Sequence, residues 1–484
     1  MRIPWLSLLA VLLIGCPDRS IDQIPPTQNG VMVKKIPVSA DIDILFVIDN
    51  SQSTLDKQTV FSQNFPRFVE ALDAFPMGRP NLHIGVVDTT VDIGVQGYAS
   101  GNTGCPSPDP RDNGLLQNAP RLAGCMAPNG QFLGDIKNPD GSRSVNYSGA
   151  LEQALSCIAL IGAEGCGFEA PLEAMKRALD GSRPENAGFI RNGAYLGVIL
   201  LTDEDDASVK DKAVFSLPDS MVGGKSDFRL QPLFAYRCAT PISSTAPGTY
   251  DRCTPRADSY LQDPHSYSQF LATIKDPGQI VVAAIAGPPP GLQTNDSPPQ
   301  TANAPSIRVD SLTLNGITQG LALQPSCSAT INGNPAIGRP GLRLASFIGD
   351  FGDRGRFYTV CQGDYSAALA DIGKTLFNAI SPCLEGPIDP TDADPGDPGV
   401  QLQCTVSDVQ VDDRTGETSR VIAACPMQDA TTPAAGGPRP CWWVSQDPAR
   451  CPAPDTGFEL ELVRTQPPAP GTNVVVECAL TPSH

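Results

Sequence analysis

Four short apolar runs, separated by stretches with a helical pattern, constrain the fold of this chain more than any other feature of its sequence. The clearest is YLGVILLT at residues 195–202, which shows no alternation of polar and apolar side chains. Such a run is typical of a strand buried on both faces of a parallel sheet. The other runs lie at residues 43–49, 82–87 and 279–286, and a shorter strand is predicted at residues 356–360.

Amphipathic stretches lie between these runs. Phe61, Phe65 and Phe68 recur at helical spacing after the first strand, and Pro66 predicts a kink there. Strands that alternate with helices predict an α/β fold, here a doubly wound, Rossmann-like domain with a mainly parallel sheet. Further helices are expected at residues 150–160, 171–179, 266–274, 342–351 and 365–380.

At 484 residues the chain exceeds one ordinary core, and several units are expected. The α/β domain is predicted at residues 40–383, with long insertions braced by disulfides at about 94–149, 207–262 and 287–340. Residues 384–398 are rich in proline and aspartate and predict a rigid linker. Alternating apolar residues beyond it predict a small, cysteine-containing β domain at residues 399–484.

The first sixteen residues have the pattern of an export signal: a charged start, a short apolar stretch and a small residue before Cys16. The stretch is shorter than the roughly 20 residues of a membrane-spanning helix. LIGC resembles the lipobox of bacterial lipoproteins, which implies lipidation of Cys16 and a tether over residues 17–39. Pro17 favours the outer membrane by resemblance to sorted lipoproteins, on the periplasmic or the cell-surface side. The alternative is a secretory signal with an incidental cysteine.

Fourteen cysteines remain when Cys16 is set aside from the fifteen, an even number in an exported chain. Disulfides are therefore expected, whereas the cysteines and the three histidines show no zinc-type spacing. Spacing makes four local pairs plausible without proving them: Cys105 with Cys125, Cys157 with Cys166, Cys238 with Cys253, and Cys441 with Cys451.

The formal net charge of −18 opposes nucleic-acid binding, because that affinity depends on lysine and arginine side chains that neutralise phosphates. It favours cationic partners or partners bridged by a metal ion.

A DxSxS motif follows the first strand, with Asp49, Ser51 and Ser53 in one tight loop. The strand at residues 195–202 is followed by Asp203. In a parallel sheet both strand ends lie at the same edge, where ligands bind in open α/β sheets. Two hydroxyls and few carboxylates supply hard oxygen ligands for one divalent cation, Mg²⁺, Ca²⁺ or Mn²⁺.

This combination resembles the von Willebrand factor A family, whose metal-ion-dependent adhesion site uses DxSxS, a threonine in a middle loop and a later aspartate. The resemblance covers about residues 40–383 and implies direct ligation by Ser51 and Ser53, with mostly water-mediated contacts from Asp49 and Asp203. The middle threonine is not matched, and Glu169 stands near its expected position. FVIDNSQS, LHIGVV and GFEAPLEA look closest to cysteine-rich von Willebrand A lipoproteins of myxobacterial type, among them a gliding-motility adhesin.

The expected function is that of a membrane-anchored binding or adhesion protein and not of an enzyme. Its partner would be a protein or surface ligand that offers an acidic or other oxygen-donor group to the cation. One alternative is an envelope scaffold with a degenerate metal site, favoured by the missing threonine. A metal-dependent hydrolase is less favoured, because Ser51 stands where haloacid-type phosphatases need a second aspartate, and no GxSxG occurs. Asp205 and Asp206 are interpreted as a solvated acidic loop, with a second cation site as the alternative.

Overall fold

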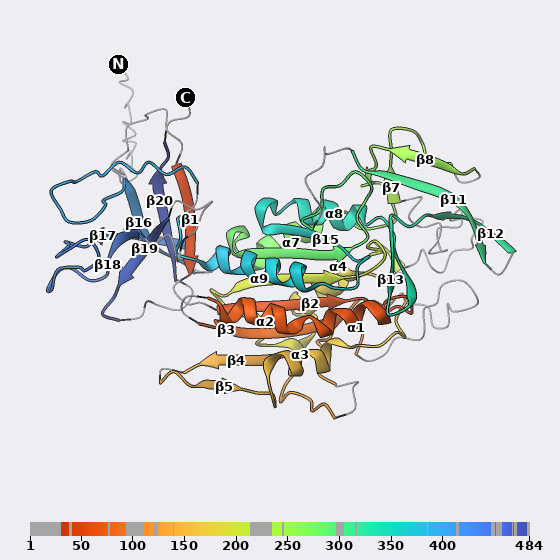
Figure 1. Ribbon diagram of the computed structural model, residues 1–484, viewed down its shortest axis with the longest axis horizontal. Coiled ribbons are helices and arrows are strands. Elements are labelled where there is room, and N and C mark those ends of the chain that lie inside the picture. The colour runs from red at the N-terminus through yellow and green to blue at the C-terminus, as the bar shows by residue number, and fades with distance from the viewer. Residues whose placement is uncertain are drawn as a thin grey trace, which may run out of the picture.

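The computed structural model consists of two lobes and a group of smaller sheets (Figure 1). A six-stranded sheet stands beside one end of a layered α/β body, and the smaller sheets gather at the other end. The structure describes residues 31–37, 41–75, 78–92, 111–119, 124–138, 140–212, 235–243, 246–296, 304–314, 317–384, 386–412, 416–446, 451, 457–466, 468 and 472–481.

The α/β body is built on a seven-stranded sheet with a parallel centre. The neighbouring pairs β15–β10, β10–β6, β6–β2 and β2–β3 are parallel, whereas β3–β4 and β4–β5 are antiparallel. The central strands are buried along most of their length because helices cover both faces. In sheet order the strands are β15 (Gly355–Thr359), β10 (Ile280–Ala286), β6 (Tyr195–Leu201), β2 (Asp41–Ile48), β3 (Asn81–Asp88), β4 (Leu133–Lys137) and β5 (Arg143–Val145).

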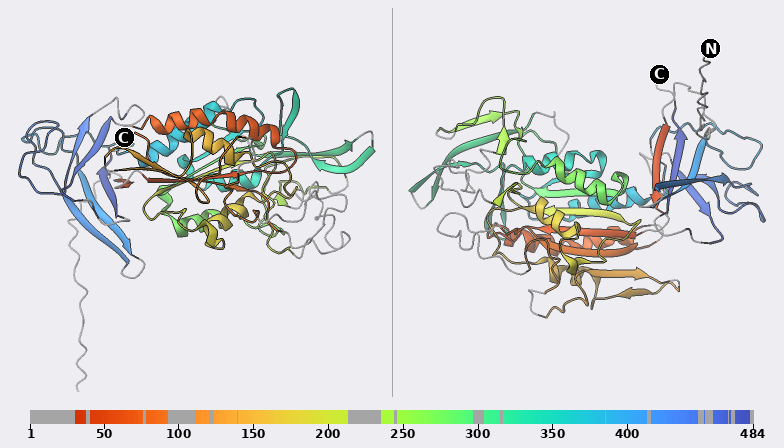
Figure 2. Two further views of the ribbon diagram at one scale, coloured as in Figure 1. Left: turned by 90° about the horizontal axis from the view of Figure 1, so that it is seen from below. Right: turned by 180° about the vertical axis from the view of Figure 1, so that it is seen from behind.

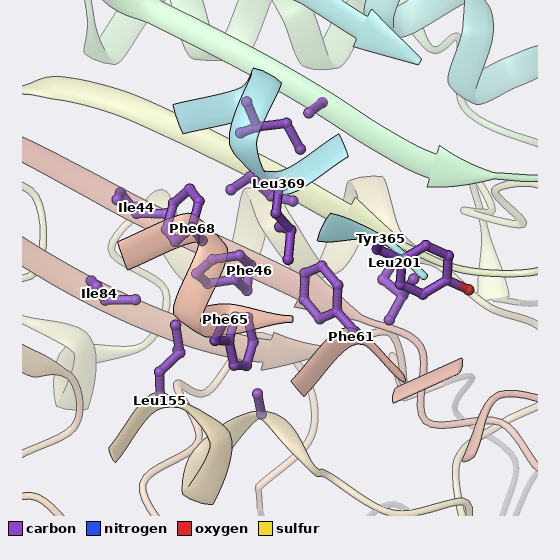
Figure 3. Close-up of a cluster of buried hydrophobic side chains, with 14 of the residues drawn as sticks. Ile44, Phe46, Phe61, Phe65, Phe68, Ile84, Leu155, Leu201, Tyr365 and Leu369 are labelled. Carbon is purple, nitrogen blue, oxygen red and sulfur yellow. The ribbon is translucent and has the colours of Figure 1, made fainter. Parts of the chain in front are cut away.

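Two apolar cores fill the spaces between the sheet and its helices, which lie on both sides of it (Figure 2). Figure 3 shows one core, in which Phe46 of β2 meets Phe61, Phe65 and Phe68 edge to face at centroid distances of 5.6–5.7 Å. The predicted kink is a break at Asn64 between α1 (Leu55–Gln63) and α2 (Phe65–Asp73). These two helices, α3 (Leu151–Ala159) and α9 (Ser366–Ile380) cover one face, and α4 (Pro171–Leu179), α7 (His265–Ile274) and α8 (Leu342–Gly349) cover the other.

The six-stranded sheet forms the second lobe, which contains the first and the last strand that the structure describes. Strand β1 (Val31–Pro37) pairs antiparallel with β20 (Thr472–Ala479) at one edge of the six-stranded sheet. In the chain, the α/β body is thus inserted between β1 and the other five strands of this sheet. The predicted tether at residues 17–39 is therefore wrong over residues 31–37, which form a strand. The sheet continues from β20 through β16 (Cys404–Asp412), β17 (Gly416–Ala424) and β18 (Cys441–Gln446) to β19 (Phe458–Val463).

The second and third insertions contribute small antiparallel sheets at the carboxyl ends of the central strands, whereas the first contributes β4 and β5 to the edge of the seven-stranded sheet (Figure 1). Arg339 follows strand β14 (Asn334–Gly338) and donates its backbone N–H to the carbonyl of Asp203. This bond fixes the hairpin of β13 and β14 beside the end of β6. The sheets contain β8 (Gly248–Asp251) with β11 (Ser306–Leu314) and β12 (Ile317–Leu323), β13 (Cys327–Ile331) with β14 (Asn334–Gly338), and β7 (Tyr236–Arg237) with β9 (Thr254–Pro255). Short 3-10 turns occur at Pro184–Asn186, Pro277–Gln279 and Gly352–Arg354.

The predicted fold class, a doubly wound Rossmann-like fold with a mainly parallel sheet, is wrong for this protein. It is a mixed α/β protein: its largest sheet is itself mixed, and the other sheets are antiparallel apart from the short β17–β18 pairing. The apolar runs predicted the parallel centre correctly. They carry no information on the shorter strands, some of which form hairpins with the next strand while others, such as β1, pair with a distant segment.

The predicted linker at residues 384–398 is also wrong in part. Leu384 and Ile388 are buried in the core of the six-stranded lobe, and Ile388 bridges to Leu480. The prolines and aspartates of residues 384–398 therefore lie in a segment that is anchored to the β lobe by the side chains of Leu384 and Ile388.

Six disulfides join pairs of cysteines that both lie in the described residues, and they confirm the expectation of an oxidised chain. Of the four predicted pairs, Cys238 with Cys253 is confirmed. The others are wrong where they can be compared, because Cys125 pairs with Cys157 and Cys441 pairs with Cys425, whereas Cys105 lies outside the described residues. Cys166 is disulfide-bonded as well. The remaining pairs are Cys327–Cys361, Cys383–Cys451 and Cys404–Cys478.

The predicted export signal and Cys16 lie outside the described residues. Within the described part of the chain, every helix is too short or too polar to cross a bilayer.

Candidate functional site

The candidate site lies where two adjacent parallel strands end. Residues Ile48 of β2 and Leu201 of β6 are paired in register, and the backbone N–H of Asp49 donates to the carbonyl of Leu201 at 2.9 Å. Asp49 and Asp203, which are 154 residues apart in the chain, therefore follow neighbouring strand ends at the same edge of the sheet.

Side chains of α1 fix the DxSxS loop. The Thr54 hydroxyl donates to the carbonyls of Asp49 and Ser51 at 2.8 and 2.9 Å. The Gln58 amide donates to the Asp49 carbonyl at 2.7 Å and to the Gly162 carbonyl at 2.7 Å. The loop thus keeps one conformation, because its own backbone oxygens are held by buried donors from the following helix.

The oxygen atoms predicted to form the site converge. Ser53 Oγ donates to Asp203 Oδ1 at 3.0 Å, and Ser53 Oγ lies 3.3 Å from Ser51 Oγ. Asp49 lies behind them and accepts from the Ser51 N–H and from the Thr202 hydroxyl, both at 2.7 Å. Asp49, Asp203 and Ser51 are buried whereas Ser53 is exposed, so the arrangement opens to solvent at Ser53.

A buried lysine, which the sequence did not indicate, points into the same cluster. Lys57 Nζ lies 3.0 Å from Asp203 Oδ2 and donates to the carbonyl of Ser53 at 2.8 Å. Both side chains of the Lys57–Asp203 ion pair are only 2% exposed. Asp203 Oδ2 has no other partner among the residues that the structure describes.

Glu169 reaches the neighbourhood of the site on the loop between α3 and α4. Gly165 in this loop donates its N–H to the Asn50 carbonyl at 2.6 Å, and a Cβ at that position would lie 2.2 Å from Asn50 Oδ1. Only glycine permits this close approach. Glu169 is buried, and within the described ranges its side chain makes no hydrogen bond to Ser51, Ser53 or Asp203. Its proposed substitution for the family's threonine stays a prediction.

The buried carboxyl groups raise one another's pKa. Burial and the charge of Asp203 raise the pKa of Asp49 to about 7. Burial, followed by the charge of Glu204, raises the pKa of Glu169 well above its ordinary value. The pKa of Asp203 is also raised by burial, although Lys57 opposes this effect. The cluster therefore holds more negative charge than its surroundings readily accommodate.

Charge balance provides a test of whether a divalent cation fits. Glu204 is paired with Arg339 at 2.7 Å, which leaves buried Asp49, Glu169 and Asp203 opposite Lys57. The raised pKa of each of these three groups means that burial disfavours their ionised forms, and a divalent cation beside them would favour ionisation. The donors are hydroxyl and carboxylate oxygens, which suit Mg²⁺, Ca²⁺ or Mn²⁺. Within the described part of the chain, no group of three or more His, Cys, Asp or Glu side chains is placed to hold a metal by itself. A cation at this position would need the hydroxyl oxygens of Ser51 and Ser53 as ligands beside the Asp203 carboxylate.

The acidic run after β6 is neither a solvated loop nor a second cation site, and both interpretations are wrong. Asp205 accepts from Tyr236 and from two backbone N–H groups at the start of α8. Asp206 is buried, and Arg343 donates both to its Oδ2 and to its backbone carbonyl, while Asp206 Oδ1 accepts from the Leu172 N–H. These bonds tie the Asp203 loop to α4 and α8.

Two threonines that the sequence analysis missed also support the site. Thr202 holds Asp49, and Thr90 donates to Asn50 Oδ1 at 2.9 Å and accepts from the Cys166 N–H at 3.1 Å. Both follow buried strands at the carboxyl edge, a signal by which they could have been found. No such signal marks Lys57.

His265 forms a contact of a type associated with hydrolases. Its Nδ1 lies 2.8 Å from the Asp350 carboxylate, and its Nε2 lies 3.2 Å from Ser346 Oγ. However, Ser346 lies inside α8, where the backbone N–H groups serve the helix and are not free to form an oxyanion hole. The contact links α7 to α8 at an exposed surface.

No family model matches this chain, and no curated protein matches it. Among solved structures, the chain is similar to the pilus adhesin SpaC from Lactobacillus rhamnosus GG in its open conformation, with 11% identity and a TM-score of 0.29 over 94% of this chain and 41% of that one. It is similar to the pilus adhesin RrgA from Streptococcus pneumoniae with 10% identity and a TM-score of 0.19, over 93% and 58%. The chain thus spans two fifths to three fifths of the length of these adhesins.

Proposed function

We propose that this protein is an extracytoplasmic binding protein, lipid-anchored at Cys16, that recognises an acidic group of a partner through one divalent cation. Ser51, Ser53 and Asp203 would hold the cation, with Asp49 behind them. The cluster is open at Ser53, so a carboxylate or another oxygen donor of a partner could complete the coordination of the ion. The disulfide-braced sheets around this edge would select the partner.

One observation carries the proposal: hydroxyl and carboxylate oxygens from two distant loops converge at one sheet edge, with Ser53 Oγ 3.0 Å from Asp203 Oδ1. The excess of buried negative charge supports it, because an ion bound there would offset the cost of burying those carboxylates. The resemblance of the DxSxS loop to the adhesion site of von Willebrand factor A proteins agrees with this reading.

Thermal unfolding with and without cation tests the proposal. A cation at 100 times its Kd stabilises the folded state by about 2.7 kcal/mol. We therefore expect MgCl₂, MnCl₂ or CaCl₂ to raise the Tm of the wild type and to leave the S51A/S53A variant unchanged. S62A is a matched control, because Ser62 lies on α1 away from the site and donates to the Thr59 carbonyl. The proposal is wrong if S51A/S53A responds to the cations as the wild type does.

An envelope scaffold with a degenerate metal site is the second candidate. Lys57 favours it, because an ammonium 3.0 Å from Asp203 Oδ2 supplies part of the charge that a metal would supply. In that case none of the three cations would change the Tm of the wild type. Surface proteolysis of intact cells adds a second criterion, since a periplasmic scaffold is protected and an exposed adhesin is cut.

We propose no enzymatic activity. Ser51 takes the position at which a haloacid-type phosphatase needs its second aspartate, and it donates its N–H to Asp49. A screen with generic phosphate and ester substrates tests this expectation. Turnover that is lost in D49N would establish a hydrolase at this site, and turnover lost in S346A would assign it to the His265 contact.

A further inference from the structure

We infer that Lys57 is a built-in counter-cation that lowers the affinity of the site for its divalent ion and supports the two loops when the ion has left. This inference rests on the proposed function, because it concerns the cation that the site would bind. It assigns a role to a residue that lies outside the DxSxS motif.

The placement of Lys57 is the first argument. Its ammonium group lies 3.0 Å from Asp203 Oδ2, while the other oxygen of that carboxylate, Oδ1, accepts from Ser53. The ammonium also donates to the Ser53 carbonyl and lies 3.3 Å from Asp56 Oδ1. One side chain thus connects the DxSxS loop to the loop after β6.

Burial is the second argument. Lysine is rarely buried unless its charge is paired, and here both partners of the ion pair are 2% exposed. Charges only a few ångströms apart interact strongly where water is largely excluded. A cation that binds beside Asp203 is therefore repelled by the ammonium group of Lys57, which lies against the same carboxylate. The site therefore binds a divalent ion less tightly than its carboxylates alone would.

This weakening serves a binding protein. An ion whose charge is not fully satisfied by the protein attracts an additional oxygen from a partner. Lys57 reduces the negative charge that faces the ion and keeps Asp203 paired in the absence of the ion. The lysine thus allows the cation to bind reversibly, because the buried carboxylate of Asp203 keeps a charged partner when the cation has left.

Titration of the full chain with MnCl₂ tests the inference, with calorimetry to measure the Kd and thermal unfolding as an independent readout. In K57M we expect a Kd for Mn²⁺ at least tenfold lower than in the wild type. We also expect a lower Tm in chelator and a larger Tm rise on adding Mn²⁺. K57R keeps the charge and should stay within about threefold of the wild-type Kd.

Lys275 provides the matched control. It is also buried, and its Nζ lies 4.0 Å from buried Asp43, but Asp43 lies near the opposite, amino end of β2. K275M should lower the Tm in chelator and leave the Kd for Mn²⁺ unchanged. This result would separate the loss of a buried ammonium in general from its loss at the candidate site.

The possible outcomes separate this inference from the proposed function. If the wild type binds Mn²⁺ and K57M binds it equally or more weakly, the inference is wrong while the proposed function stands. If only K57M binds Mn²⁺, Lys57 acts as inferred, but cation-dependent recognition by the wild type is wrong. If neither binds, both are wrong. Should K57M fail to fold in chelator, K57Q replaces it, provided that the circular dichroism spectrum of K57Q matches that of the wild type.

Discussion

The contact between Arg343 and Asp206 should be among the most important polar interactions for stability. Both side chains are 0% exposed, and Arg343 donates to Asp206 Oδ2 at 2.9 Å, to the Asp206 carbonyl at 2.8 Å and to the Gln262 carbonyl at 2.6 Å. Replacing Arg343 with methionine keeps the unbranched stem of the side chain and removes these donors. Asp206 would then be a buried carboxylate with only the Leu172 and Ser208 donors.

Breaking a buried pair by removing one partner typically costs about 3–5 kcal/mol, because the remaining charge is uncompensated. For a domain of this size, with about 2 °C per kcal/mol, the Tm of R343M should fall by about 6–10 °C. Differential scanning calorimetry and far-UV circular dichroism measure this change. The R343M/D206N double variant should lose less stability than the sum of the two single variants, because the two residues interact directly.

Arg67 and Glu70 form the matched surface pair. Both side chains are 62% exposed at an N–O distance of 2.7 Å, and R67M should leave the unfolding free energy nearly unchanged because solvent screens the pair. The reasoning is refuted if R343M loses no more stability than R67M, because burial would then not determine the strength of these pairs.

Three further changes test other parts of the fold. F46A removes the ring at the centre of the aromatic core and should cost about 3–5 kcal/mol, measured by urea unfolding. The C404S/C478S variant removes a disulfide between β16 and β20 and should cost about 2–5 kcal/mol, measured by urea unfolding. Full reduction of the wild type also opens the other disulfides and should cost more, so a smaller loss on reduction would contradict this prediction. For Asp135, burial alone would raise the pKa, but hydrogen bonds from Arg143, Arg79 and Tyr147 outweigh it and lower the pKa below 3.8. The stability that this carboxylate contributes is thus present above pH 3.8 and lost as the pH falls through the lowered pKa. The difference in unfolding free energy between wild type and D135N should therefore narrow below about pH 4. A constant difference from pH 7 to pH 2 would contradict this prediction.

The sequence predicted the parts of this protein that depend on local patterns. The run at residues 195–202 became β6, and the helical spacing of Phe61, Phe65 and Phe68 became α1 and α2 with a break near Pro66. The convergence of Ser53 and Asp203 followed from one rule, that neighbouring parallel strands end at the same edge. These inferences needed only residue type and spacing.

What the sequence did not predict depends on contacts between distant segments. Strand β1 is short and its Val31 and Val33 are exposed, so its pattern gives no sign of its partner β20, more than 400 residues away. The pairing of Cys125 with Cys157 depends on the arrangement of the loops in space and not on their spacing. Burial of Lys57 likewise became visible only when Asp203 was placed beside it.

The most direct test of the account is anomalous diffraction from crystals grown with MnCl₂. The account predicts a manganese peak in contact with Ser51 Oγ and Ser53 Oγ, next to the Asp203 carboxylate. A well-occupied manganese ion elsewhere, with Ser53 still bonded to Asp203 and no peak between the two loops, would contradict it.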